Sequence, residues 1–388
     1  MTSVAQGQQV TRYEYDLLGR LTKVITPDGA ETAYAYDALG NIIGETDPLG
    51  NTTQFAYTPE NLLAQVTYAN GATQRLDYDL AGNVTAETDG EGYTKHYKYD
   101  RVNRLTAVVD EAGNTTGYKY DALDNIAQVT DAMKHVTKYT YDKNGNLLTE
   151  TDALGNTVTY AYTPEGWLSS VTKADGAVMT FEYDKTGNLL AQNTGENQSI
   201  ENSYNEIGQV TTVKNSEGTI TYQYNQQGYL VSVTNVNGDV VSYTYDEYGN
   251  KTSMTYPDGR AVRYTYDSMN RMTSVTGLDG EVTTYAYDAA GRRVETASRT
   301  LTTEYRYDVV GSLVEQSTTG SSNIRFQYTY NLNGYITGEV RTENGAAVES
   351  LYTYQSIIRD WGGSSGGGIQ FDLPKPINWL IQNGYLSK

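Results

Sequence analysis

The sequence predicts an all-β fold, in which tandem β-hairpins pair into one long coiled sheet. The first observation is composition: the 388 residues include 37 Tyr but only 4 Phe and 3 Trp. Together with many Thr, Val and Gly, this favours half-buried strands and turns over helices. The second is a Tyr-x-Tyr-Asp motif that recurs at near-constant spacing, and the third is a set of turn residues that recur between the motifs. Self-similarity of this kind is typical of repeat architectures.

The second tyrosine of the motif sets the register of the repeat. It returns every 21 residues from Tyr15 to Tyr204, and every 20 or 21 residues from Tyr224 to Tyr307. The complete series is Tyr15, Tyr36, Tyr57, Tyr78, Tyr99, Tyr120, Tyr141, Tyr162, Tyr183, Tyr204, Tyr224, Tyr245, Tyr266, Tyr287, Tyr307, Tyr330 and Tyr354. We therefore divide the chain into a lead-in at 1–10, an array of about 17 units at 11–355, and a tail.

Each unit reads as one hairpin. Strands are expected near 21–26 and 31–36, on either side of the Asp28-Gly29 turn signal. Tyr34 and Tyr36 are two residues apart and so share a face, where we expect the next aromatic pair, Phe55 and Tyr57, to lie beside them. This pattern predicts aromatic rows that connect neighbouring repeats.

The aspartate after the tyrosines marks a second turn. Asp37, Asp142 and Asp246 each lie three residues before a glycine. A carboxylate there can accept a backbone N–H two residues on, while the glycine supplies positive φ. Calcium ligation is the alternative, but each turn offers one carboxylate where calcium takes roughly six to eight oxygens. We expect no metal and no cofactor.

About 17 hairpins give roughly 34 strands, and open twisted sheets rarely exceed about ten strands without curling. We therefore predict a spiral, or a partial hollow wall. Its terminal strands would leave unpaired sheet edges, through which copies of the chain can self-associate.

Charge and composition exclude several classes of partner. The formal net charge is −19 and the acidic residues are spread along the chain, so nucleic acid and anionic membranes are disfavoured. There is no cysteine, no stretch long and apolar enough to span a membrane, and no signal-peptide pattern at the start. We expect a secreted or surface location as part of a larger protein.

The unit Tyr13-Glu14-Tyr15-Asp16-Leu17-Leu18-Gly19-Arg20-Leu21 resembles the YD or Rhs repeats of bacterial polymorphic toxins, toxin-complex proteins and teneurins. The resemblance covers about residues 10–355. It implies a hollow β-shell that, in the toxins, encapsulates a C-terminal toxic domain. The self-cleaving core that follows the repeats in cargo-releasing members is not recognisable here, because Asp47-Pro48-Leu49-Gly50 lies in an ordinary hairpin turn.

The tail departs from the repeat. Residues 356–368 read as a Gly/Ser-rich linker. Residues 369–388 resemble the end of the TNT family of NAD glycohydrolase toxins, and the resemblance places that family's active-site glutamine at Gln370. The family's arginine and histidine have no counterpart, since His96 and His135 lie inside regular repeats. An isolated glutamine cannot cleave a glycosidic bond, so we expect an inactive remnant and no enzyme.

Three functions follow for testing. The first is a shell fragment that encloses or presents a C-terminal toxin cargo between competing bacteria, with other shell segments as partners. The second is a surface protein that binds cell-wall glycans, because tyrosine faces stack on sugars and offer a hydroxyl. The third, an NAD glycohydrolase, is disfavoured by its incomplete catalytic set.

Overall fold

The structure, a computed structural model, describes residues 2–6, 9–195 and 199–352. It divides into a repeat unit that ends at Thr353 and a short unit from Tyr354 to Lys388. The linker and the tail, 356–368 and 369–388, lie outside the described residues.

The strands are β1 Thr2–Gln6, β2 Gln9–Tyr15, β3 Leu21–Ile25, β4 Glu31–Tyr36, β5 Ile42–Thr46, β6 Thr52–Tyr57, β7 Leu63–Thr67, β8 Thr73–Tyr78, β9 Val84–Thr88, β10 Thr94–Tyr99, β11 Leu105–Val109, β12 Thr115–Tyr120, β13 Ile126–Thr130, β14 Val136–Tyr141, β15 Leu147–Thr151, β16 Thr157–Tyr162, β17 Leu168–Thr172, β18 Val178–Tyr183, β19 Leu189–Asn193, β20 Ser199–Tyr204, β21 Val210–Asn215, β22 Gly218–Tyr224, β23 Leu230–Thr234, β24 Val240–Tyr245, β25 Lys251–Thr255, β26 Ala261–Tyr266, β27 Met272–Thr276, β28 Val282–Tyr287, β29 Arg293–Ala297, β30 Leu301–Tyr307, β31 Leu313–Gly320, β32 Ile324–Tyr330, β33 Ile336–Glu343 and β34 Ala346–Leu351.

These 34 strands form one antiparallel meander, in which each strand pairs with the strands before and after it in the sequence. The described residues contain no helix. The all-β hairpin prediction is confirmed, and the two strands expected in the first unit appear as β3 and β4. Among the described strands, β1 pairs only with β2 and β34 only with β33, so the sheet remains open.

Residues 2–6 and 9–10 of the expected lead-in belong to the sheet. β1 pairs with β2 from Thr2↔Tyr13 to Gln6↔Gln9, so the meander begins before the first tyrosine motif. The tyrosine spacing marks only motif-bearing strands, and β1 carries none.

The sheet has two chemically different faces. In β4, Tyr34 and Tyr36 are half-buried while Ala35 between them is exposed. Tyr34 faces Glu45 across the strands, and Ala35 faces Gly44. One face of this strand pair therefore carries the aromatic side chains, as strand alternation predicts, and the other carries Ala35 and Gly44.

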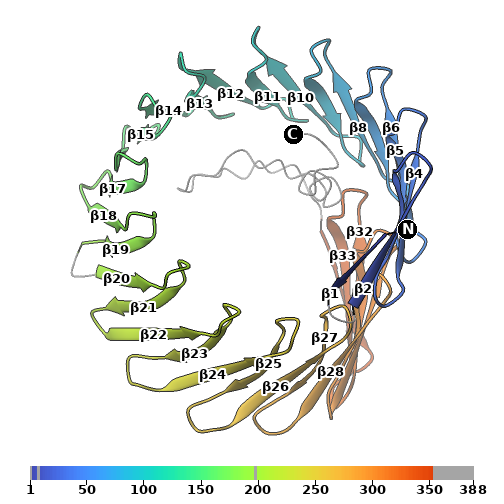
Figure 1. Cartoon of the computed structure of the whole chain (residues 1–388). Coiled ribbons are helices and arrows are strands. Elements are labelled where there is room, and N and C mark those ends of the chain that lie inside the picture. Colours follow the sequence, from blue (N-terminus) through green and yellow to red (C-terminus); the bar gives the residue numbers. More distant parts are fainter. Residues whose placement is uncertain (1, 7–8, 196–198, 353–388) are drawn as a thin grey trace. The chain divides into compact units, whose positions relative to one another are not determined.

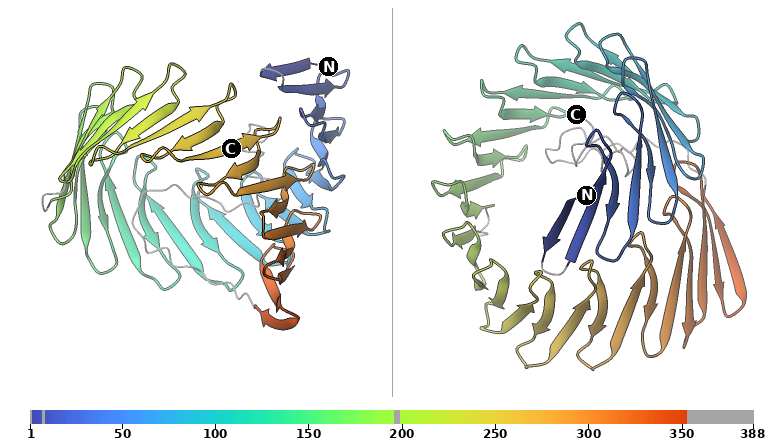
Figure 2. Two further views of the ribbon diagram at one scale, coloured as in Figure 1. Left: turned by 90° about the horizontal axis from the view of Figure 1, so that it is seen from below. Right: turned by 45° about the vertical axis from the view of Figure 1, so that its right-hand side comes forward.

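The described sheet curls until its later strands meet its earlier ones. In Figure 1 the meander passes once around, and β32 and β33 lie beside the early strands. Figure 2 shows the same sheet from two further sides as a rising coil. Hydrogen bonds join residues 241 and 244 positions apart, so roughly two-thirds of the strands complete one winding. The predicted coiling is confirmed.

Candidate functional surface

Two rows of turns form the two rims of the sheet. The tyrosine rim consists of the turns that follow the Tyr-x-Tyr strands, from 16–19 to 331–334, and the opposite rim of the turns from 26–29 to 277–280. In both rims the first residue of the turn accepts an N–H from the fourth, as Asp142 does from Gly145 at 3.1 Å. The rims thus repeat one geometry along the coil.

Asp142 shows how a carboxylate closes a turn on the tyrosine rim. Its Oδ1 accepts the backbone N–H groups of Asn144 at 2.8 Å and Asn146 at 2.9 Å, and its Oδ2 accepts from the Asn146 side chain at 2.9 Å. These bonds favour the ionised form, so the Asn146 side chain first, and then its backbone, hold the pKa of Asp142 below its usual range. The predicted turn role is confirmed, and these oxygens are already occupied by donors.

Residues that directly follow a turn connect successive turns along the tyrosine rim. The Asn83 side chain donates both to Asp79 at 2.9 Å and to Asn103 of the next turn at 3.0 Å. Arg104 bridges Asp100 and Asp124 in the same way. Both of these turns are therefore held by their own carboxylate and by the neighbouring turn.

The second tyrosine of the motif bonds to the backbone. Its hydroxyl donates to the first carbonyl of the preceding strand at 2.7–2.9 Å, and we call this contact the tyrosine latch. It is made by Tyr36, Tyr57, Tyr78, Tyr99, Tyr120, Tyr141, Tyr162, Tyr183, Tyr204, Tyr224, Tyr245, Tyr266, Tyr287, Tyr307 and Tyr330.

The latch compensates for a gap in the strand ladder. Between β13 and β14 the paired register starts at Gln128↔Lys138, which leaves Ile126 outside it. The Tyr141 hydroxyl reaches the Ile126 carbonyl at 2.9 Å. A carbonyl at a sheet rim needs a donor, so the tyrosine supplies what the diverging strands do not.

The expected aromatic rows take a different form. Each repeat contributes two strands, so the strand partner of the first aromatic residue is not aromatic: Phe55 faces Val66 and Tyr160 faces Val171. The latch ring instead meets the side chain that follows the preceding turn, as where the Arg20 guanidinium lies 4.7 Å from the Tyr36 ring centroid. Sequence reasoning predicted the face correctly and the partner wrongly, because neighbouring aromatic pairs lie two strands apart.

The winding contact joins the opposite rim of the first winding to the tyrosine rim of the second. Arg271 lies 3.1 Å from Asp28, and Asn270 accepts from Gln9 at 3.1 Å. Further along, Asn333 donates to Asp89 at 2.7 Å. Burial raises the pKa of Asp28, but hydrogen bonds and the Arg271 charge outweigh burial and lower it overall. The Arg271–Asp28 and Asn333–Asp89 pairs have nearly the same separation in sequence, so the windings stack in register.

Gly90 carries a sequence signal of this contact. Its place in the turn is filled by Pro27, Pro48 and Ala69 in the preceding repeats, so the turn itself does not require glycine. A Cβ at Gly90 would lie 2.9 Å from the Leu332 carbonyl oxygen and 3.1 Å from its Cβ. Close approach of the second winding explains the glycine, and no motif in a single repeat would have revealed it.

A polar cluster lies in the most buried part of the sheet. Glu87 accepts from Gln74 at 2.6 Å and from the Tyr97 hydroxyl at 2.9 Å, and Tyr68 donates to Gln74 at 3.3 Å. Burial, and secondarily the Glu87 charge, raises the pKa of Tyr68 to about 12. Because the carboxylate and the amide have partners and no nucleophile lies among them, the cluster stabilises the sheet instead of forming a reactive site.

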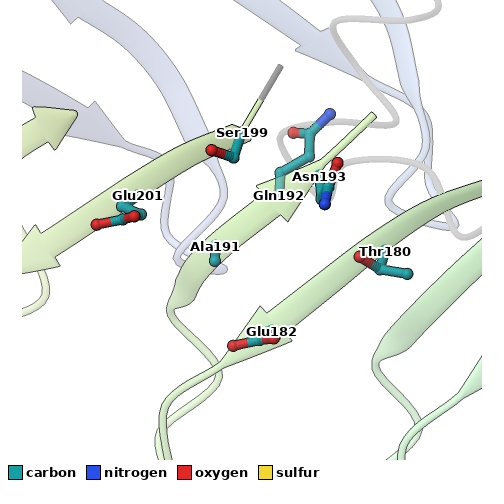
Figure 3. Close-up of a pocket in the computed structure, with 7 residues that line it drawn as sticks. All are labelled: Thr180, Glu182, Ala191, Gln192, Asn193, Ser199 and Glu201. Carbon is teal, nitrogen blue, oxygen red and sulfur yellow. The ribbon is translucent and has the colours of Figure 1, made fainter. Parts of the chain in front are cut away.

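A shallow depression on the face opposite the aromatic side chains is drawn in Figure 3. It is lined by Thr180, Glu182, Ala191, Gln192, Asn193, Ser199 and Glu201. Glu182 and Glu201 both flank Ala191, each as its cross-strand partner, and both are exposed. Two solvated carboxylates without a buried acid or a positioned base do not form a catalytic pair.

The residues singled out from the sequence do not come together. His96 is exposed, and His135 contacts Asp131 at 2.9 Å within its own turn. Gln370 lies outside the described residues. Across residues 2–6, 9–195 and 199–352 no group of three or more His, Asp or Glu could hold a metal ion. In that same part of the chain, no helix is long and apolar enough to cross a bilayer.

Comparison with known families agrees with this architecture. The teneurin YD-shell model matches residues 153–298, and the RHS repeat model matches 2–32, 36–73, 57–94, 78–115 and 99–134. No curated protein matches the sequence.

Several solved structures share the fold. The crystal structure of TcdB2-TccC3 matches with a TM-score of 0.71 and 14% identity over 89% of this chain. A Tc holotoxin pore of Photorhabdus luminescens matches with a TM-score of 0.59 and 16% identity over 88%, and TcdB2-TccC3 without its hypervariable C-terminal region with 0.59 and 16% over 90%. This chain spans 24% of the length of each.

Proposed function

The chain is a member of the Rhs/YD-repeat family, and we propose that it forms a wall segment of a toxin shell that encloses or presents a C-terminal effector in interbacterial competition. The winding contact carries the proposal, because a sheet whose windings meet through Arg271 and Asp28 becomes a continuous curved wall. Effector enclosure and a secreted or surface location are carried over from the toxin shells that share the fold. The partners would be the effector and other shell segments.

Protease protection tests enclosure directly in the full chain. We expect the segment 369–388 to be cut slowly in the wild type and faster in Gly90→Gln, since the added side chain collides with Leu332. Ala132→Gln is the matched control, because Ala132 occupies the same turn position in a repeat outside the winding contact. Equal cleavage rates in all three proteins would argue against an enclosing wall.

Catalysis is not part of the proposal. Gln370 without positioned partners cannot stabilise a departing nicotinamide. We expect NAD to remain intact when incubated with concentrated protein. Nicotinamide release that disappears in Gln370→Ala would reverse this conclusion.

Glycan binding is a weaker candidate. The latch hydroxyls donate to backbone carbonyls, so those groups are committed within the sheet. Retention of the protein on peptidoglycan would instead support glycan binding.

A further inference from the structure

Two cations replace apolar residues among the tyrosine rings of the second winding. The first residue of every odd-numbered strand from β3 to β33 is Leu, Ile, Val or Met, except in β25 and β29. In those two strands it is Lys251 and Arg293, of which the first is half-buried and the second exposed. An apolar residue satisfies the hairpin at this position in all the other repeats. A departure from so regular a pattern points to a role outside the hairpin itself.

Each of these cations lies between two tyrosine rings. The Lys251 ammonium and the Arg293 guanidinium are each 5.0–5.8 Å from the centroids of two rings, both of which belong to the first tyrosine of a Tyr-x-Tyr motif. In the part of the chain that the structure describes, the four hydroxyls make no hydrogen bond. We call this set the cation stripe, and it consists of Tyr243, Lys251, Tyr264, Tyr285, Arg293 and Tyr305.

The cation stripe has no counter-charge of its own. Among the described residues, neither Lys251 nor Arg293 forms an ion pair with a carboxylate. The acidic residues within strands β24 to β30 are Glu295 and Glu304. They pair with each other, and Glu295 also pairs with the exposed Ala286, so both lie on the face opposite the rings.

The rim aspartates next to the stripe are already bonded within their own turns. Asp246 accepts from the Asn250 side chain at 3.0 Å, and Asp288 accepts from the Arg292 guanidinium at 2.8 Å. Both carboxylates also accept backbone N–H groups of their turns. The rim therefore does not supply the missing carboxylates.

The first winding shows what a tyrosine at this motif position can bind. Tyr97 donates to the Glu87 carboxylate at 2.9 Å. The position of Glu87 is filled by Met254 in β25 and by Thr296 in β29. The Thr296 hydroxyl, whose residue pairs with Tyr285, is buried and has no hydrogen-bond partner among the described residues. The second winding thus keeps the donors of this arrangement and lacks its carboxylate.

We propose that the cation stripe binds an acidic segment of a polypeptide, whose carboxylates lie over Lys251 and Arg293 and accept hydrogen bonds from the tyrosine hydroxyls. Because β25 and β29 are four strands apart, the two cations are about 19 Å apart at about 4.8 Å per strand. An extended polypeptide rises about 3.3 Å per residue, so carboxylates about six residues apart match the cations and share one face of the segment. This inference goes beyond the wall role and does not require enclosure.

A nucleic acid fits the cation stripe less well than an acidic polypeptide. Two cations neutralise few phosphates, so little counterion release would favour binding. The ring faces are occupied by the ammonium and the guanidinium, which leaves them unavailable to stack on bases. The net charge of −19 also repels a long polyanion more than it repels a segment with two carboxylates.

Fluorescence anisotropy with the full chain and a labelled peptide tests the proposal. The probe is a Thr/Ser-rich peptide of about 12 residues with two glutamates about six residues apart, which is long enough to reach both cations. A second probe carries glutamines in place of the glutamates. We expect the glutamate peptide to bind at low salt, and less tightly as salt is added. The glutamine peptide should bind more weakly by about tenfold or more.

Lys251→Leu/Arg293→Leu removes both cations and restores the kind of residue found in the other repeats, so its circular dichroism should match the wild type. We expect it to bind the glutamate peptide about tenfold or more weakly. Lys251→Gln/Arg293→Gln, which keeps longer polar side chains, should show the same loss. Arg263→Leu/Arg306→Leu is the matched control, because it removes two exposed arginines from the opposite face, changes the net charge equally and should bind like the wild type.

Three results would overturn the proposal. The first is a wild-type protein that binds the glutamate peptide no better than the glutamine peptide. The second is an equal loss of binding in Lys251→Leu/Arg293→Leu and in Arg263→Leu/Arg306→Leu. The third is a single-stranded oligonucleotide of similar length that binds more tightly than the glutamate peptide and loses its affinity in Lys251→Leu/Arg293→Leu, which would make the stripe a nucleic-acid site.

Discussion

Tyr141→Phe isolates the tyrosine latch, because the substitution removes one oxygen and leaves the ring. The lost hydroxyl donates to the Ile126 carbonyl at 2.9 Å, and that carbonyl lies outside the ladder between β13 and β14. A hydrogen bond of this kind contributes about 1 kcal/mol net, with a range of about 0.5–1.5 kcal/mol. We expect a local loss of that size, since repeat proteins are stabilised by neighbour terms.

Tyr139→Phe is the matched control. Tyr139 lies in the same strand, and its hydroxyl makes no hydrogen bond with the described residues. Burial raises the pKa of both tyrosines, so both hydroxyls are protonated at neutral pH. The two variants therefore differ in the latch alone.

Hydrogen–deuterium exchange provides the readout. We expect amides of the turn at 142–146 to exchange about fivefold faster in Tyr141→Phe, which corresponds to about 1 kcal/mol. Peptides several repeats away should be unchanged. If Tyr141→Phe and Tyr139→Phe exchange alike, the latch contributes nothing and our account of the motif fails.

Three further predictions concern pH and metal. Hydrogen bonds lower the folded-state pKa of Asp142, so the unfolded chain binds more protons below about pH 4 and the stability of the fold should fall there. Turns closed by Asn205 and Asn225 should keep their protection from hydrogen exchange at that pH. A uniform loss of protection across all repeats at acid pH would contradict this. Burial raises the Tyr68 pKa to about 12, so the stability that this group contributes below about pH 10 should be lost as the pH rises towards 12. The loss of β-structure at alkaline pH, followed by circular dichroism, should therefore depend less on pH in Tyr68→Phe, and an unchanged pH dependence in that variant would contradict this. EDTA should leave the thermal midpoint unchanged, because the turn carboxylates already accept backbone and side-chain donors; a lower midpoint would indicate bound calcium.

Local features of the fold were predictable because their causes lie within one repeat. The Asp28-Gly29 signal predicted the hairpin, and the spacing of Asp142 and Gly145 predicted the carboxylate-closed turn. Curling also followed from the number of strands. None of these inferences needs a distant partner.

The winding period was not predictable in the same way. It depends on small twists summed over many strands, and a single repeat does not specify them. The glycine at Gly90 is explained by the contact between the windings, but the reason is apparent only once Leu332 is seen to lie against it. The latch was missed for a related reason: the sequence places Tyr36 on the correct face, while the open ladder that its hydroxyl reaches is a feature of the paired strands.

The most direct test of the coil is a disulfide across the winding contact. The chain has no cysteine, so Asp89→Cys/Asn333→Cys introduces the only pair, at side chains that hydrogen-bond at 2.7 Å. We predict an intramolecular crosslink on mild oxidation in dilute solution, and none in Asp89→Cys/Val310→Cys, where the second cysteine is displaced by one repeat. Failure of the first pair to crosslink, or equal crosslinking of both pairs, would contradict a sheet whose windings stack in register.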